Sequence, residues 1–174
     1  MSDQRAPLTM TDEEAAAFAA AVFERARQGD AVMLARLLGR GLPVNLRNHK
    51  GDSLLMLASY HGHLEAARVL LDHGADPALA NDNGQMPLAG AAFKGNLEMV
   101  RLLLERGGDP DAAAGDGRTA LMMAAMFNRV AIVDYLLQQG ADPRRRDIRG
   151  ADALASALAM GAQDTAARLQ ALAG

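Results

Sequence analysis

Three histidines, His49, His61 and His63, are the residues of this chain that could gather around a metal ion. A tetrahedral zinc site needs four positions filled, and the sequence specifies no fourth ligand near these histidines. The chain has no cysteine, which excludes disulfides, thiol catalysis and cysteine-ligated zinc. We also find no nucleophile with a matching base, no carboxylate pair and no phosphate-binding loop. We therefore expect no enzyme activity, no metal and no cofactor.

Basic residues cluster in two short stretches that we expect to be loops: Arg47 and Lys50 in the first, and Arg144, Arg145, Arg146 and Arg149 in the second. The chain as a whole has a net charge of -3, and aromatic residues do not alternate with these arginines. Because nucleic-acid binders usually combine a basic surface with stacking aromatics, we expect no nucleic-acid partner. Two interpretations remain, a solvated loop tip and a contact with an acidic patch on a protein.

The elements that position these residues are defined by a repeat. Glycine recurs at intervals of 33 residues in two series: Gly51, Gly84, Gly117 and Gly150, and Gly41, Gly74, Gly107 and Gly140. Three copies of one loop follow the second series and include Asp76, Asp109 and Asp142. Neighbouring repeats should lie about 10 Å apart, so these aspartates cannot act as a catalytic pair. We expect them to bond to nearby backbone instead.

Each repeat contains two short helices, because apolar residues recur between the glycines at the same period. Side chains at Ser53, Thr119 and Asp152 can accept a hydrogen bond from a free amide at the start of the first helix, and Pro87 suits a first helical turn. The second helix should end at the next loop glycine, where a left-handed residue costs glycine little. These glycines are therefore predicted to be structural.

The segment from Gly62 to Pro77, which includes Gly62-His63-Leu64-Glu65 and Gly74-Ala75-Asp76-Pro77, resembles an ankyrin repeat. The resemblance covers roughly residues 20–174 and implies an all-α ankyrin repeat solenoid of stacked helix-turn-helix units with short projecting β-turn loops. In this family a histidine in the first helix links adjacent turns by hydrogen bonds. Here that position holds other residues, namely Met56, Ala89, Met122 and Ala155. We therefore expect a more weakly linked array, with His63 placed at a helix start.

The resemblance implies one domain over residues 9–174, preceded by a mobile segment at 1–8. Its expected parts are an N-terminal cap at 9–47, repeats at 48–80, 81–113 and 114–146, and a C-terminal cap at 147–174. A helix beginning at Thr9 or Thr11 and running to about Arg27 should use Phe18, Val22 and Phe23 to cover the first repeat. Gln170 replaces a leucine of the internal repeats, as a polar outer face requires.

The sequence contains no apolar run that resembles a secretory signal and no run of 18 apolar residues. We therefore expect a cytoplasmic protein without a membrane partner. Half of the residues are hydrophobic but only 3% are aromatic, so the core should consist mainly of leucine, alanine and methionine.

The surface that ankyrin-like arrays use for binding consists of the projecting turns and the exposed side of the first helices. Tyr60, Phe93 and Met126 share one position in the repeat and should form a row there, with Phe127 and Met160 beside it. Alternatively, these side chains only cover the neighbouring helices. The candidate partner-binding residues are Lys50, Asp52, Tyr60, His61, Asn83, Gln85, Phe93, Lys94, Asp116, Arg118, Met126, Phe127, Arg146, Arg149 and Met160.

Aromatic residues, methionine and arginine are enriched at the centres of protein interfaces. We therefore hypothesise a non-catalytic adaptor or inhibitor, monomeric when free, that holds one protein partner in a concave groove. Two alternatives stay open: an immunity-type protein that neutralises a toxin or effector enzyme, and an array that associates with itself through its ends.

Overall fold

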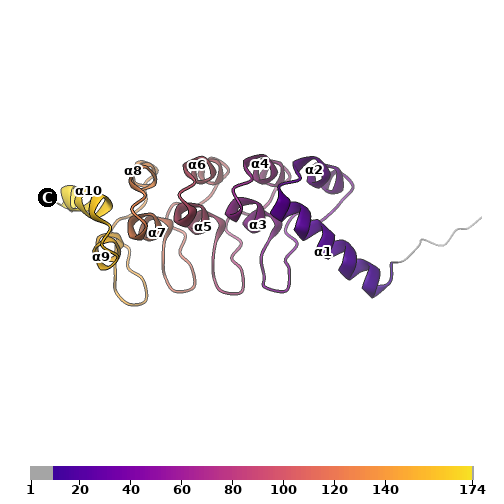
Figure 1. The fold of residues 1–174 in the computed structure, drawn as a ribbon, viewed down its shortest axis with the longest axis horizontal. Helices are drawn as coiled ribbons and strands as arrows, with labels where there is room; N and C mark the ends of the chain where they lie inside the picture. Colours follow the sequence, from indigo (N-terminus) through magenta and orange to yellow (C-terminus); the bar gives the residue numbers. More distant parts are fainter. Residues whose placement is uncertain (1–9, 174) are drawn as a thin grey trace, which may run out of the picture.

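The computed structural model describes residues 10–173, so the segment predicted to be mobile at 1–8 lies outside the described residues. Two rows of antiparallel helices form an elongated array, with one set of loops projecting from one edge (Figure 1). Residues 10–173 form ten helices: α1 (Asp12–Gln28), α2 (Ala31–Gly39), α3 (Leu54–Tyr60), α4 (Leu64–Asp72), α5 (Pro87–Lys94), α6 (Leu97–Glu105), α7 (Ala120–Met126), α8 (Val130–Gln138), α9 (Ala153–Ala159) and α10 (Gln163–Ala173). This arrangement confirms the predicted all-α solenoid.

The helix boundaries follow from the predicted local signals. Ser53, Thr119 and Asp152 each accept a hydrogen bond from a free amide of the next helix, at distances of 3.0, 3.3 and 2.9 Å. Pro87 is the first residue of α5, where its missing amide leaves no bond unmade. Gly74, Gly107 and Gly140 follow the second helices with φ of 87°, 93° and 92°, as expected for residues in the left-handed region.

The core lies between the two helix rows and repeats along the array. One leucine is buried at the same position of α4, α6 and α8, namely Leu70, Leu103 and Leu136, each with 0% exposure. The first helices contribute small residues to the junctions between repeats, including Ala91 and Ala124, which are also fully buried. Alternation of leucine with alanine lets each helix pair approach the next closely.

The long helix α1 covers the N-terminal end of the array. It starts with a capping box in which the Thr11 hydroxyl accepts a bond from the amide of Glu14 and the Glu14 carboxylate accepts one from the amide of Thr11. Val22 and Phe23 are buried as predicted, but Phe18 is 42% exposed. The expectation for Phe18 was wrong because the first turns of α1 extend beyond the array (Figure 1).

The projecting loops are linked directly to one another by hydrogen bonds between their backbones. The amide of Asp82 donates to the carbonyl of Lys50 at 3.1 Å, and Ile148 donates to Asp116 in the same way at 3.0 Å. Between them, Gly115 donates to Gly84 at 3.2 Å. Neighbouring loops are therefore joined by backbone hydrogen bonds that do not involve the first helices.

Candidate partner-binding groove

The predicted row of Tyr60, Phe93 and Met126 lies at the ends of α3, α5 and α7. Tyr60 is 40% exposed, whereas Phe93 and Met126 are half-buried. The ring of Phe93 packs edge-to-face on Phe127 with centroids 4.7 Å apart, and the Lys94 ammonium lies 4.7 Å from the centre of the Tyr60 ring. Part of the row therefore supports its neighbours, and Tyr60 is its most accessible member.

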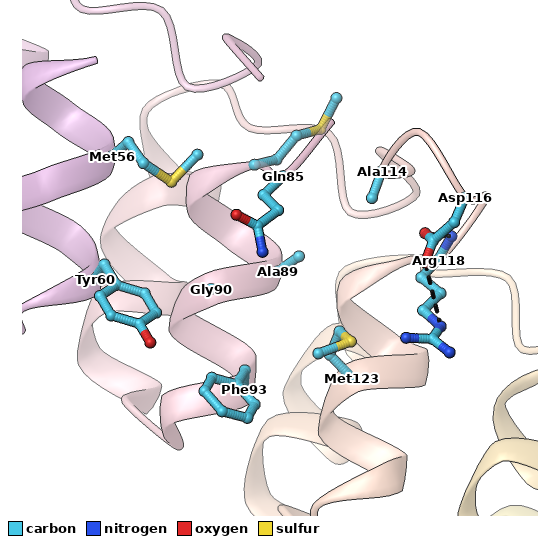
Figure 2. A pocket seen from close by; sticks show the side chains of 11 residues that line it. Met56, Tyr60, Gln85, Ala89, Gly90, Phe93, Ala114, Asp116, Arg118 and Met123 are labelled. Carbon is cyan, nitrogen blue, oxygen red and sulfur yellow. Dashed lines mark hydrogen bonds and ion pairs between the residues drawn. The ribbon is translucent and has the colours of Figure 1, made fainter. Parts of the chain in front are cut away.

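A hollow of about 350 Å³ lies beside this row (Figure 2). Its floor is α5, which carries Ala89 and Gly90 where the neighbouring first helices carry larger residues. Met56 and Tyr60 from α3 form one wall and Met123 from α7 forms the other (Figure 2). The hollow exists because one helix has small side chains between two helices with large ones.

A second hollow of about 280 Å³ lies two repeats further along, over α9. The floor is again made of small residues, Ala155, Ser156 and Ala159, and Met126 of α7 borders it. Arg118 borders both hollows and is held in place by Asp116 at 3.4 Å and Asp147 at 3.9 Å. Helices with large and small side chains alternate along the groove, so the two hollows are separated by the ridge of α7.

The structure divides the predicted site residues into three groups. Those lining the first hollow are Tyr60, Gln85, Phe93, Asp116 and Arg118. Those lining the second are Arg118, Met126, Arg149 and Met160. The remaining predicted residues line neither hollow: Lys50, Asp52, His61, Asn83, Lys94, Phe127 and Arg146.

Several residues of the first hollow were absent from the predicted set: Met56, Met86, Ala89, Gly90, Ala114 and Met123. The signal that could have identified this hollow is the Ala89-Gly90 pair, which interrupts a position that is bulky in the repeats on either side. A single repeat does not reveal it, because the depth of a hollow depends on the contrast between neighbouring helices.

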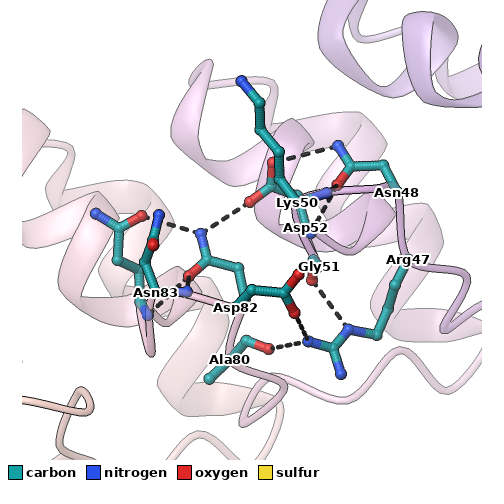
Figure 3. A network of polar contacts seen from close by, with 10 residues as sticks. Arg47, Asn48, Lys50, Gly51, Asp52, Ala80, Asp82 and Asn83 are labelled. Atoms are coloured by element: carbon teal, nitrogen blue, oxygen red, sulfur yellow. Dashed lines mark hydrogen bonds and ion pairs between the residues drawn. The ribbon is translucent and has the colours of Figure 1, made fainter.

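Two of the predicted binding residues, Asp52 and Gln85, are tied into the scaffold of the loops. Figure 3 shows the contact of Asp52 with Asn48. The side-chain amide of Asn81 donates to the Asp52 carboxylate at 2.8 Å and to the Gln85 carbonyl at 2.9 Å. Asn48 donates to the other Asp52 oxygen at 3.2 Å. Asp52 therefore links one loop to the next.

His63 has structural surroundings. A ring nitrogen of His63 lies 2.7 Å from the carbonyl oxygen of Arg27 and so links α4 to the preceding unit. His63 occupies the start of α4 as predicted, although its side chain makes no capping bond to that helix. Within residues 10–173 no group of three or more histidine, aspartate or glutamate side chains could hold a metal ion.

The loop aspartates bond to backbone as expected. Asp76, Asp109 and Asp142 each accept a bond from the amide two residues ahead, at 2.8, 2.9 and 2.9 Å. The bond from the amide of Arg144, helped by the Arg144 guanidinium and the charge of Arg145, lowers the pKa of Asp142. These carboxylates stabilise turns, and their arrangement offers no acid-base pair.

No helix of the described part of the chain is both long and apolar enough to cross a membrane.

Comparison with known families gives matches over most of the chain. A model of three consecutive ankyrin repeats matches residues 19–114, and a model of a single ankyrin repeat matches residues 116–148. The chain is similar to an ankyrin repeat protein of Pseudomonas aeruginosa, with 56% identity over 63 residues, which are 36% of this chain and 37% of that protein.

Two vertebrate proteins are also similar over part of the chain. The inactive serine/threonine-protein kinase TEX14 of Mus musculus is 38% identical over 69 residues, or 40% of this chain and 5% of the kinase-like protein. Ankyrin repeat domain-containing protein 29 of Danio rerio is 44% identical over 57 residues, or 32% of this chain and 19% of that protein. The chain thus matches well under two thirds of the length of each relative.

Proposed function

The chain belongs to the ankyrin repeat family, and from this premise we propose that it is a non-catalytic adaptor or inhibitor that holds one protein partner in its concave groove. Ankyrin repeats are generally modules for protein–protein interaction. The observation that carries the proposal is the pair of hollows beside the row of Tyr60, Phe93 and Met126. Hollows of this kind accept the bulky anchor side chains that supply most of the free energy of binding.

The chemistry of the groove supports a protein partner. Tyr60 and Phe93 provide rigid apolar surface, and Met56 and Met123 provide side chains that adapt their shape to a partner. Arg118, fixed between two aspartates, offers a positioned charge at the border of both hollows. The row of first helices spans about 30 Å from α3 to α9, which is long enough for an interface of roughly 800 Å² per partner.

The test begins with capture of partners from the source organism by the wild-type protein, followed by calorimetry with each purified candidate. We expect a Tyr60→Ala, Phe93→Ala double variant to bind its partner about 30-fold more weakly or worse, because it removes two anchors. Phe18→Ala is the matched control, since Phe18 is exposed to the same degree as Tyr60 but lies on α1. Equal binding by the wild type and the double variant would remove the groove from the proposal.

A second variant tests the groove by filling it. Gly90→Leu places a side chain in the first hollow without removing any contact, since a β-carbon there has Tyr60 as its nearest neighbour at 3.5 Å. We expect the partner to be excluded while thermal unfolding stays close to that of the wild type. Undiminished binding by this folded variant would contradict use of the first hollow.

A further inference from the structure

The contact between the first two loops shows which groups of one loop bind the next loop. The Arg47 guanidinium donates to the Ala80 carbonyl at 3.0 Å and to the Asp82 carboxylate at 3.2 Å (Figure 3). The amide of Asp82 in turn donates to the Lys50 carbonyl at 3.1 Å. One arginine and one carbonyl thus bind a segment that enters a turn, and its carboxylate lies two residues after the bound carbonyl.

The last loop presents the same groups, and nothing within residues 10–173 covers its outer edge. Arg146 and Arg149 lie three repeat lengths after Arg47 and Lys50 in the sequence. Within residues 10–173 the guanidinium of Arg146 forms no hydrogen bond or ion pair, and its side chain is exposed. The edge of this loop therefore offers both a guanidinium and, by position, the Arg149 carbonyl.

The glycines give independent evidence that this edge is open. A β-carbon added to Gly51 would lie 2.2 Å from the Asp82 carboxylate, and one added to Gly84 would lie 2.5 Å from the amide nitrogen of Gly115. At Gly150, which has the same position in the last repeat, a β-carbon meets no atom within 4 Å. The space that a following loop fills elsewhere is therefore accessible here.

The charge around this edge selects the kind of segment that fits. Asp142 is paired with Arg144 at 3.3 Å, and Asp147 is 6% exposed and accepts bonds from two amides of its own loop. Among the described residues, no ion pair neutralises Arg145, Arg146 or Arg149. The accessible charge is positive, and the side chain of Ile148, which is 76% exposed, adds an apolar surface beside it.

We propose that the open edge of the last loop binds an acidic turn of a partner protein in the way that the first loop binds the turn of the second. A carboxylate and a backbone carbonyl of the segment accept bonds from Arg146, and a backbone amide donates to the carbonyl of Arg149. A second copy of the chain stacking end to end is a poor occupant, because its first loop would bring Arg47 and Lys50 against these arginines. Arg149 also lines the second hollow, so this surface adjoins the groove, but Arg146 and Ile148 line neither hollow.

The probe for this proposal is a synthetic peptide with the sequence of residues 77–87 of the chain itself, which contains the natural acidic segment of the second loop. Binding to the full-length, isotope-labelled protein is followed by nuclear magnetic resonance at millimolar peptide. We expect shifts at the amides around Ile148 to Gly150 and at the Arg146 side chain. The same peptide with Asp82→Asn should bind about tenfold more weakly, because a charge-assisted bond is lost.

Matched protein variants separate a specific contact from net charge. Arg146→Ala should weaken binding of the acidic peptide about tenfold, whereas Arg145→Ala removes the same charge from an adjacent exposed position and should change binding less than about threefold. Equal losses in the two variants would overturn the proposal, as would the absence of shifts in the last loop.

Other occupants would be revealed by the same spectra. Shifts confined to the groove would place peptide binding there and reject the loop site, while leaving the proposed function intact. A single-stranded RNA oligonucleotide that shifts the last-loop amides at lower concentration than the peptide would overturn the proposal in favour of nucleic acid. Shifts at these amides that grow with protein concentration alone would overturn it in favour of a second copy.

Discussion

The second helices and the groove side of the first helices differ in how closely the repeats resemble one another. Leu70, Leu103 and Leu136 occupy one position of the repeat and are equally buried. The repeats therefore use the same residue to pack the second helix against the core. On the groove side, one position holds Met56, Ala89, Met122 and Ala155, and the next changes just as freely. Packing of one repeat on the next determines the residues at the repeating positions. The residues that vary between repeats leave two hollows, which this packing does not require.

The largest effect should come from a repeating position. Leu103→Ala removes a fully buried side chain between neighbouring repeats and should lower the free energy of unfolding by about 3 kcal/mol. Urea denaturation followed by circular dichroism measures the change. A loss below about 1 kcal/mol would show that the second-helix layer does not carry the stability of the array.

The next comparison uses one glycine position of the repeat, once where a following loop covers it and once where it is open. Gly84→Ala forces a β-carbon against the backbone of the following loop and strains a residue with φ of 72°, so we expect a loss of about 2–3 kcal/mol. Gly150→Ala carries the same backbone strain at φ of 81° but meets no neighbour, so about 1 kcal/mol should be lost. Equal losses in urea denaturation would mean that contact between loops contributes little.

At a position that varies between the repeats, a substitution should raise the free energy of unfolding and not lower it. Gly90 lies inside α5, where glycine costs stability through the entropy of the unfolded chain, and a β-carbon there makes an ordinary contact with Tyr60 at 3.5 Å. Gly90→Ala should raise the free energy of unfolding by about 0.5–1 kcal/mol. Ala91→Gly in the same helix is the control and should lower it. A loss of stability in Gly90→Ala would show that packing, and not the groove, requires this glycine.

The smallest effect concerns pH at a repeating loop aspartate. Folding lowers the pKa of Asp142 below its ordinary value of 3.8, mainly through the bond from the amide of Arg144. The ionised carboxylate therefore stabilises the fold above that pH, and its contribution disappears as the pH falls through the lowered pKa. The difference in melting temperature between wild type and Asp142→Asn should be present at neutral pH and vanish in acid. A difference that persists in strong acid would point to packing instead of charge.

Much of the fold could be predicted because its signals are local and occur several times. Ser53, Thr119 and Asp152 mark helix starts by their chemistry alone, and the glycine periodicity sets the length of the unit. The site was less predictable. Gly90 borders a hollow only because Met56 and Met123 stand on the helices beside it, which is a relation between repeats and not within one.

The loop contacts show the same limit. Asp52 has the residue type and position of an exposed binding group, yet Asn81 of the next loop holds its carboxylate. Phe18 fits an apolar helix face, but the array ends before it can cover that side chain. The surroundings of Asp52 and of Phe18 both depend on where a neighbouring element lies, and no local pattern in the sequence predicts that.

The hydrogen bonds that join the repeats also bear on how the chain can assemble. The side-chain bonds from one unit to the next connect residues 29 to 40 positions apart, from the Asn81–Asp52 pair to the Thr165–Ala125 pair. Each newly made repeat therefore needs only its predecessor to dock, and loop-closure entropy stays small at every step. Such a chain can fold progressively, with each unit docking on a neighbour that has already folded.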